Sequence, residues 1–160
     1  GYGVEPDVMT LAKALGNGIP IGAFCARGKF ADVLKPGNHG TTYGGNPIAT
    51  ATAAAALTAI IENKLPERAQ EMGAYLQERL NEMKKKHPVI KEVRGRGLIV
   101  GAVLDVEDAH VVTNPCFEKG LILNCTAGNV LRFVPALNIP KETLDDALEI
   151  LEQVLTEIGK

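Results

Sequence analysis

Apolar residues recur at helical spacing in three long stretches of this sequence. Residues 47–62 are apolar on nearly every side and begin with a proline, so we expect a buried helix that opens at Pro47. A second stretch starts at Pro66 and stops at Pro88, with charged residues opposite its apolar stripe, and predicts an amphipathic helix. A third stretch, over about 141–158, also predicts a helix, because acidic residues lie near its N-terminal end, where the helix dipole favours negative charge. The stripes of the second and third helices are Leu65, Ala69, Met72, Leu76, Leu80 and Met83, and Leu144, Ala147, Leu148, Leu151, Val154, Leu155 and Ile158.

Shorter apolar runs predict strands. Residues 89–94 and 98–104 are expected to be strands joined across Gly95-Arg96-Gly97, and 121–124 and 130–134 are expected to be two more. A short helix is expected from about Asn114 to Gly120, with Pro115 in its first turn.

Residues 7–26 allow two interpretations. Val8, Leu11 and Leu15 fit a helical stripe, whereas residues 19–26 have the composition of a buried strand. The glycine punctuation at 16–18 favours strand, turn, strand. The whole pattern predicts an α/β protein in two parts, residues 1–62 and a small α+β domain over 63–160.

Composition limits the classes of function. The chain has 160 residues, 46% hydrophobic and 22% charged, which is ordinary for a globular protein. A net charge of −2 gives no reason to expect nucleic acid or a membrane surface as a partner, and no apolar run is long enough to span a bilayer. The chain opens with neither an initiator methionine nor a capped element, so we expect it to be a piece of a longer protein.

The cysteines and histidines show no ligand spacing. Three cysteines without a C-x-x-C motif indicate reduced thiols in the cytoplasm, with neither a disulfide framework nor a zinc site. The histidines are interpreted as structural or surface residues, so no metal site is expected. The residues concerned are Cys25, Cys116 and Cys125, and His39, His87 and His110.

Lys13 is the most informative single residue. It lies among apolar neighbours and directly before the glycine-rich turn at 16–18. Apolar surroundings disfavour the ammonium form, and a tight turn lets the backbone approach a flat cofactor. A lysine that forms a Schiff base needs this setting. An ordinary solvated lysine is the alternative.

Two further places carry candidate chemistry. The loop at 39–46 combines glycines with the adjacent hydroxyls of Thr41 and Thr42 and leads into a helix N-terminus, which suits a phosphate. A turn with Asn46 as N-cap is the alternative. Arg132 lies in an apolar strand, where its guanidinium would grip a substrate carboxylate or form a structural ion pair.

Three motifs together resemble the class III aminotransferases, which use pyridoxal phosphate (PLP). They are P-D-V-M-T-L-A-K-A-L-G-N-G-I-P-I-G-A at 6–23, H-G-T-T-Y-G-G-N-P at 39–47 and N-V-L-R-F-V-P-A-L at 129–137. The resemblance covers essentially the whole chain, and the acetylornithine branch of the family is the most similar. It implies the fold type I architecture, with residues 1–62 as the end of the large PLP-binding domain and 63–160 as most of the small C-terminal domain.

The resemblance also implies residue roles. Lys13 would form the Schiff base with PLP and move the proton between substrate and cofactor, and Thr42 would bind the cofactor phosphate of the neighbouring subunit in a homodimer. Thr41 would contact substrate, and Arg132 would grip a substrate carboxylate. The substrates would be N-acetylornithine and 2-oxoglutarate, in arginine biosynthesis.

Some family features are absent from the sequence. The D-E-x-Q motif that supplies the partner of the pyridine nitrogen does not occur here, and a pyridinium without its carboxylate is a poor electron sink. We therefore expect the isolated chain to be inactive. The alternatives are ornithine, succinylornithine or 4-aminobutyrate aminotransferase, or a non-catalytic association module.

Overall fold

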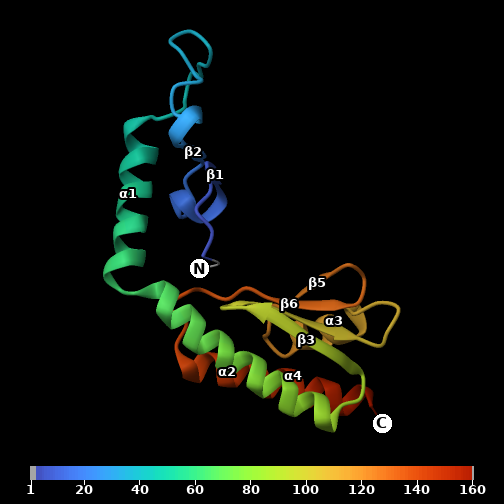
Figure 1. The fold of residues 1–160 in the computed structure, drawn as a ribbon. Helices are drawn as coiled ribbons and strands as arrows, with labels where there is room; N and C mark the ends of the chain where they lie inside the picture. The colour runs from blue at the N-terminus through green and yellow to red at the C-terminus, as the bar shows by residue number, and fades with distance from the viewer. Residues whose placement is uncertain (1–2, 160) are drawn as a thin grey trace. The chain divides into compact units, whose positions relative to one another are not determined.

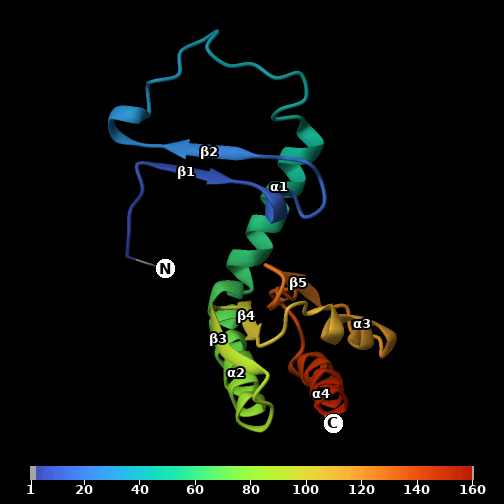
Figure 2. The same cartoon turned by 90° about the vertical axis from the view of Figure 1, so that its right-hand side faces the viewer.

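A computed structural model describes residues 3–159, and these divide into two compact units on either side of the Asn63–Lys64 bond. Each unit is described by itself. Figures 1 and 2 show the strands and helices of both.

The first unit is a hairpin with one long helix. Strands β1 (Val8–Leu11) and β2 (Ala23–Ala26) pair antiparallel, with Val8 opposite Ala26. The short 3-10 helices η1 (Lys13–Gly16) and η2 (Gly28–Phe30) follow the two strands, and α1 (Pro47–Glu62) contacts η1. The interpretation as strand, turn, strand is therefore confirmed for residues 7–26, although the second strand begins at Ala23 and not at Ile19 as expected.

The sequence predicted that the second strand and the long helix of this unit would be buried, and within this chain that prediction is wrong. Both β2 and α1 are largely exposed; Ile48 and Ile61 are 73% and 72% exposed, and only Ala49 and Ala53 of α1 are buried. The bounds of α1 agree with the prediction, because proline and periodicity are local signals. Burial depends on partners, and a two-stranded ribbon with one helix has too few layers to cover every apolar face.

The second unit is an antiparallel sheet with helices. The strands are β3 (Ile90–Arg96), β4 (Ile99–Leu104), β5 (Asn124–Thr126) and β6 (Val130–Phe133), in the order β3-β4-β6-β5. The helices are α2 (Leu65–Lys86), α3 (His110–Glu118) and α4 (Lys141–Ile158). Helices α2 and α4 lie side by side on one face of the sheet (Figure 1).

The core of this unit lies between those helices and the sheet. One face of β4 and β6 meets the predicted apolar stripes of α2 and α4, which are mostly buried as expected. Side chains at most 1% exposed include Leu76, Leu80, Val100, Ala102, Leu104, Leu131, Leu148, Leu151 and Leu155. The opposite face of the sheet carries Ile99, Gly101 and Arg132.

Helix α3 begins four residues earlier than predicted, and β5 begins three residues later. The Asp108 carboxylate accepts the His110 backbone N–H at 3.0 Å and so starts the helix there, leaving Pro115 inside it. The Leu121 N–H donates to the Cys116 carbonyl at 2.8 Å, which extends the end of α3 where a strand was expected. These two hydrogen bonds set the bounds of α3 and β5, and the spacing of apolar residues does not predict them.

Candidate functional site

Lys13 occupies a strained turn. It is the first residue of η1, which one residue separates from β1. Its φ is +56°, a left-handed conformation that residues other than glycine seldom adopt. The following Asn17 and Gly18 also have positive φ, and Gly16 is buried so tightly that an added Cβ would lie 2.7 Å from Ile21 Cγ2. The turn therefore fixes the backbone at Lys13, while its side chain is exposed.

The loop before α1 is folded by its own side chains. The Thr41 Oγ1 accepts the Gly44 N–H at 3.3 Å, and the Asn46 side chain donates to the Tyr43 carbonyl at 2.9 Å. Asn46 Oδ1 also accepts the Ala49 N–H at 3.0 Å, so Asn46 is the N-cap of α1. Within residues 3–159 the Thr42 hydroxyl has no hydrogen-bond partner, and it is exposed.

These groups fit part of a site for a phosphorylated aldehyde such as PLP. Lys13 supplies an amine, Thr42 supplies a free hydroxyl, and the Thr41 proton is not used within the loop. The Asn46 cap occupies an amide of the first turn of α1, so the hydroxyls are the better phosphate donors. The N-cap interpretation and the phosphate interpretation are therefore compatible.

Within one chain, Lys13 and the loop at 39–46 lie in different parts of the first unit. The loop extends past the N-terminal end of α1, whereas η1, with Lys13, lies alongside this helix (Figures 1 and 2).

Arg132 lies in the second unit, on the sheet face away from α2 and α4. In β6 it is opposite Gly101 of β4 and Asn124 of β5, while the preceding Leu131 is fully buried. The residue is exposed, and among residues 3–159 no carboxylate lies within ion-pair distance of its guanidinium. The structural ion pair, which was the alternative interpretation of Arg132, is therefore not present in the described part of the chain.

A cavity of about 440 Å³ adjoins Arg132. Residues 121–124, the end of β6 with the following turn, and α4 line it, and most of the lining is apolar. Neither feature follows from the sequence pattern, because Asn124 comes beside Arg132 only through the pairing of β5 with β6, and the cavity forms only when these segments and α4 pack together.

No helix within residues 3–159 combines the length and apolarity that a membrane crossing requires.

Comparison with known proteins shows the family to which the chain belongs. The sequence profile of the family Aminotransferase class-III matches residues 1–155. The chain is 49% identical over 157 residues to the acetylornithine aminotransferase of Caldanaerobacter subterraneus subsp. tengcongensis, covering 98% of this chain and 40% of that protein. It is 47% identical over 155 residues to the ornithine aminotransferase of Staphylococcus carnosus, covering 96% of this chain and 38% of that protein.

A solved structure agrees with the sequence comparison. The ornithine aminotransferase of Toxoplasma gondii, described as having partial occupancy of PLP at its active site, superposes with a TM-score of 0.90 and 38% identity. The superposition covers 98% of this chain and 38% of that one.

The chain belongs to the class-III aminotransferases, a PLP-dependent family, and its fold is that of the corresponding part of these enzymes. The fold class and the family resemblance predicted from the sequence are thereby confirmed. The chain spans about 40% of the length of the relatives that it matches, which include both acetylornithine and ornithine aminotransferases.

Proposed function

We propose that the protein containing this chain is a PLP-dependent aminotransferase that moves the terminal amino group of N-acetylornithine to 2-oxoglutarate, in arginine biosynthesis. The observation that carries the proposal is the exposed Lys13 in its strained turn, within a chain that matches the family from residue 1 to residue 155. Strained backbone at an exposed reactive side chain is typical of functional sites.

Lys13 is the catalytic residue in this proposal. PLP, when bound, supplies an aldehyde for covalent attachment and an electron-accepting ring. The Lys13 amine would hold the cofactor, and as the general base it would hold and move the proton at the carbon that bears the substrate's amino group. The rigid turn from Gly16 to Gly18 keeps the lysine in one place for both tasks.

The active site is proposed to be shared between two subunits of a homodimer. Thr42 binds the cofactor phosphate of the neighbouring subunit, and Thr41 contacts substrate. The separation of the 39–46 loop from η1 along α1 supports this arrangement, because a single chain keeps the two groups apart. The partners are then a second copy and small amino-acid and 2-oxo-acid substrates.

Arg132 is proposed to bind a substrate carboxylate. Its guanidinium is exposed and has no acidic partner among residues 3–159. A planar guanidinium can hold a carboxylate with two parallel hydrogen bonds, which gives both affinity and orientation. Residues 1–62 then end the large PLP-binding domain, 63–160 form most of the small domain, and the enzyme is cytoplasmic.

Ornithine, succinylornithine and 4-aminobutyrate are the alternative amino donors. The first has a specific observation in its favour, since the Staphylococcus carnosus relative is nearly as similar as the acetylornithine one. A non-catalytic association module is the alternative from another class, but such a module has no need of a lysine held in a strained turn.

The attachment site is tested by reducing the full-length holoenzyme with borohydride and mapping the labelled peptide. We expect the pyridoxyl adduct on Lys13. An adduct on Lys29 or Lys35, the nearby lysines of the same unit, would contradict the assignment. Values of kcat/KM for N-acetylornithine, ornithine, succinylornithine and 4-aminobutyrate then decide the donor.

A further inference from the structure

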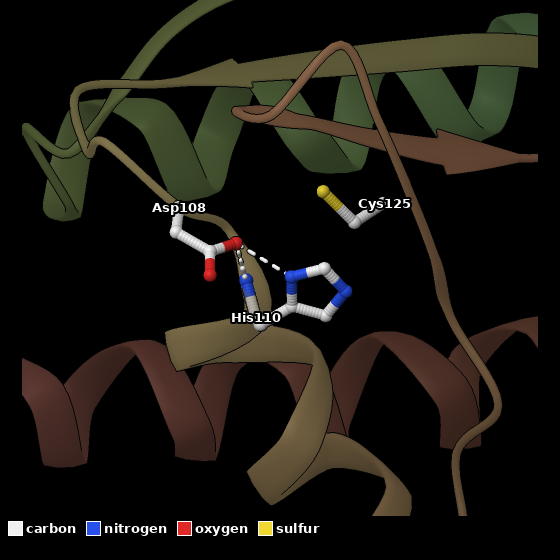
Figure 3. A group of neighbouring side chains, drawn as sticks. All are labelled: Asp108, His110 and Cys125. Carbon is white, nitrogen blue, oxygen red and sulfur yellow. Dashed lines mark hydrogen bonds and ion pairs between the residues drawn. The ribbon is translucent and has the colours of Figure 1, made fainter.

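Three side chains that could bind a metal ion converge in the second unit, apart from the residues assigned above. Asp108 and His110 come from the segment that opens α3, and Cys125 comes from the edge strand β5 (Figure 3). One carboxylate oxygen, one imidazole nitrogen and the Sγ atom all lie within 4.8 Å of one another. We propose that these three groups form a site for a zinc ion.

The chemistry of the three groups suits zinc. Thiolate, imidazole and carboxylate are the ligand types that bind zinc, at about 2.3 Å for sulfur and about 2.0–2.2 Å for nitrogen and oxygen. Tetrahedral geometry with these bond lengths places the ligand atoms roughly 3.3–3.6 Å apart. The ligand atoms of the three residues, all within 4.8 Å of one another, are therefore close enough to share one ion. Calcium and magnesium prefer oxygen ligands and are not matched by this set.

The backbone on both sides of the site is fixed. The N–H of Ala109, which is fully buried, donates to the Gly128 carbonyl at 2.8 Å and so joins the start of α3 to the β5–β6 turn. The end of β4 is joined to the same turn twice, because Leu104 N–H donates to the Asn129 carbonyl at 2.9 Å and the Asn129 side chain donates to the Leu104 carbonyl at 3.0 Å. Segments distant in sequence are therefore held together without the metal.

The side chains keep the freedom that metal entry requires. Asp108 and His110 are 61% and 59% exposed. Asp108 Oδ1 contacts both the His110 backbone N–H and, at 2.5 Å, the Nδ1 of its ring. On zinc binding this contact between the carboxylate and the ring opens, because the two ligand atoms of a tetrahedral zinc ion lie roughly 3.3–3.6 Å apart. Cys125 Sγ–H donates to the Gly128 carbonyl at 3.4 Å; on binding zinc, the thiol releases its proton to solvent and the sulfur turns to the ion.

The site is an open one. Three protein ligands leave the fourth position of a tetrahedral zinc ion to water. Sequence spacing does not reveal the site, since Cys125 is remote from Asp108 and His110 in the chain and the three meet only through the fold.

The proposal is tested on the 160-residue chain with zinc chloride in a calorimetric titration. We expect one zinc ion per chain. Cys125→Ser and His110→Gln should each weaken the apparent affinity by at least about tenfold, as loss of a metal-site group does. The matched controls are Cys25→Ser and His39→Gln, which replace an exposed thiol and an exposed imidazole of the first unit. They should bind zinc as the parent chain does.

Two further measurements do not depend on stability. Cobalt(II) in place of zinc should give a near-ultraviolet sulfur-to-metal band that Cys125→Ser abolishes and Cys25→Ser retains. In the unsubstituted chain, zinc should slow iodoacetamide alkylation of Cys125 and leave that of Cys25 unchanged. Absence of saturable 1:1 binding, equal losses in the control variants, or equal protection of both thiols would overturn the proposal, leaving an exposed Asp–His pair beside an unrelated cysteine.

Discussion

At the scale of single residues, Lys13 and Arg132 differ in how the fold presents them. Lys13 is held by a left-handed backbone, which costs of order 1–3 kcal/mol for a residue other than glycine. Arg132 has an ordinary strand backbone and is distinguished by its missing partner within residues 3–159. Lys13 is thus distinguished by its backbone conformation, and Arg132 by an exposed charge that no carboxylate within residues 3–159 balances.

Arg132→Lys should therefore impair carboxylate recognition and leave cofactor attachment intact. Lysine keeps the charge but loses the two-pronged donor geometry, so the full-length enzyme should lose about 2–5 kcal/mol of transition-state binding. The measurement is kcat/KM for α-amino acid or dicarboxylate substrates, with a simple amine that has no carboxylate as control. An equal loss on both substrate types, or a failure to fold, would make Arg132 a structural residue.

At the scale of elements, α2 and α4 are joined by a polar network at the edge of the core. The Tyr75 hydroxyl donates to Asp145 Oδ1, and Arg79 donates to that same oxygen at 3.0 Å. Lys141 donates to Asp145 Oδ2 at 3.0 Å and lies 4.3 Å from the centre of the Tyr75 ring. The Tyr75 hydrogen bond first, and then that of Lys141, lower the pKa of Asp145 below its ordinary value of 3.8.

Asp145→Asn should lower the free energy of unfolding at neutral pH. A carboxyl group whose pKa is lowered by folding stabilises the folded state above its unfolded pKa of 3.8, and that contribution is lost as the pH falls through the lowered folded pKa. The difference between variant and parent, measured by urea denaturation of this chain, should be full at pH 7 and shrink below pH 3.8. Asp146→Asn, an exposed neighbour on α4, is the control and should show no such pH-dependent difference.

Helix α2 also approaches the β3–β4 turn so closely that only glycine fits at position 73. A Cβ atom added to Gly73 would lie 2.0 Å from the Gly97 carbonyl oxygen. Gly73→Ala should therefore lower the free energy of unfolding of the second unit by about 1–3 kcal/mol, although alanine is the better helix former. Urea denaturation measures this, with exposed Gln70→Ala, expected within about 0.5 kcal/mol of the parent, as control. Equal stability of Gly73→Ala would mean that the turn yields without cost.

These elements also show how far a sequence predicts this fold. The bounds of α1 and α4 follow from local signals, a proline or acidic start and an apolar period. The start of α3 and the start of β5 depend on hydrogen bonds made by Asp108 and Leu121, which no local pattern encodes. Periodicity identifies the apolar stripe of α4, but the exposure of Ile48 and Ile61 on α1 depends on what else packs there.

The residues of the candidate site also fall into those that the sequence predicts and those that only the fold reveals. Motifs identified Lys13, Thr42 and Arg132 as candidates, because reactive residue types stand out from their apolar or glycine-rich context. Residues that become neighbours only through folding were missed, including Asn124 beside Arg132 and Cys125 beside His110.

At the scale of the whole molecule, the chain holds only some of the groups that PLP chemistry requires. In the proposed function Lys13 attaches the cofactor and Thr42 binds its phosphate, but η1, with Lys13, and the loop at 39–46 lie in different parts of the first unit. A D-E-x-Q motif is also absent from the sequence. Apolar faces of β2 and α1 are exposed, which leaves the surroundings of Lys13 open to water.

We therefore expect the isolated chain to bind PLP weakly and without selectivity among its lysines. Titration with PLP, followed by the visible absorption of the lysine-bound cofactor, should show no saturation at one equivalent, and Lys13→Ala should change the titration little. The full-length protein is the control and should bind one equivalent per subunit, with Lys13→Ala abolishing the absorption band. Tight 1:1 binding by the isolated chain that depends on Lys13, together with transaminase turnover, would show that the missing ring and phosphate contacts are supplied from within these 160 residues.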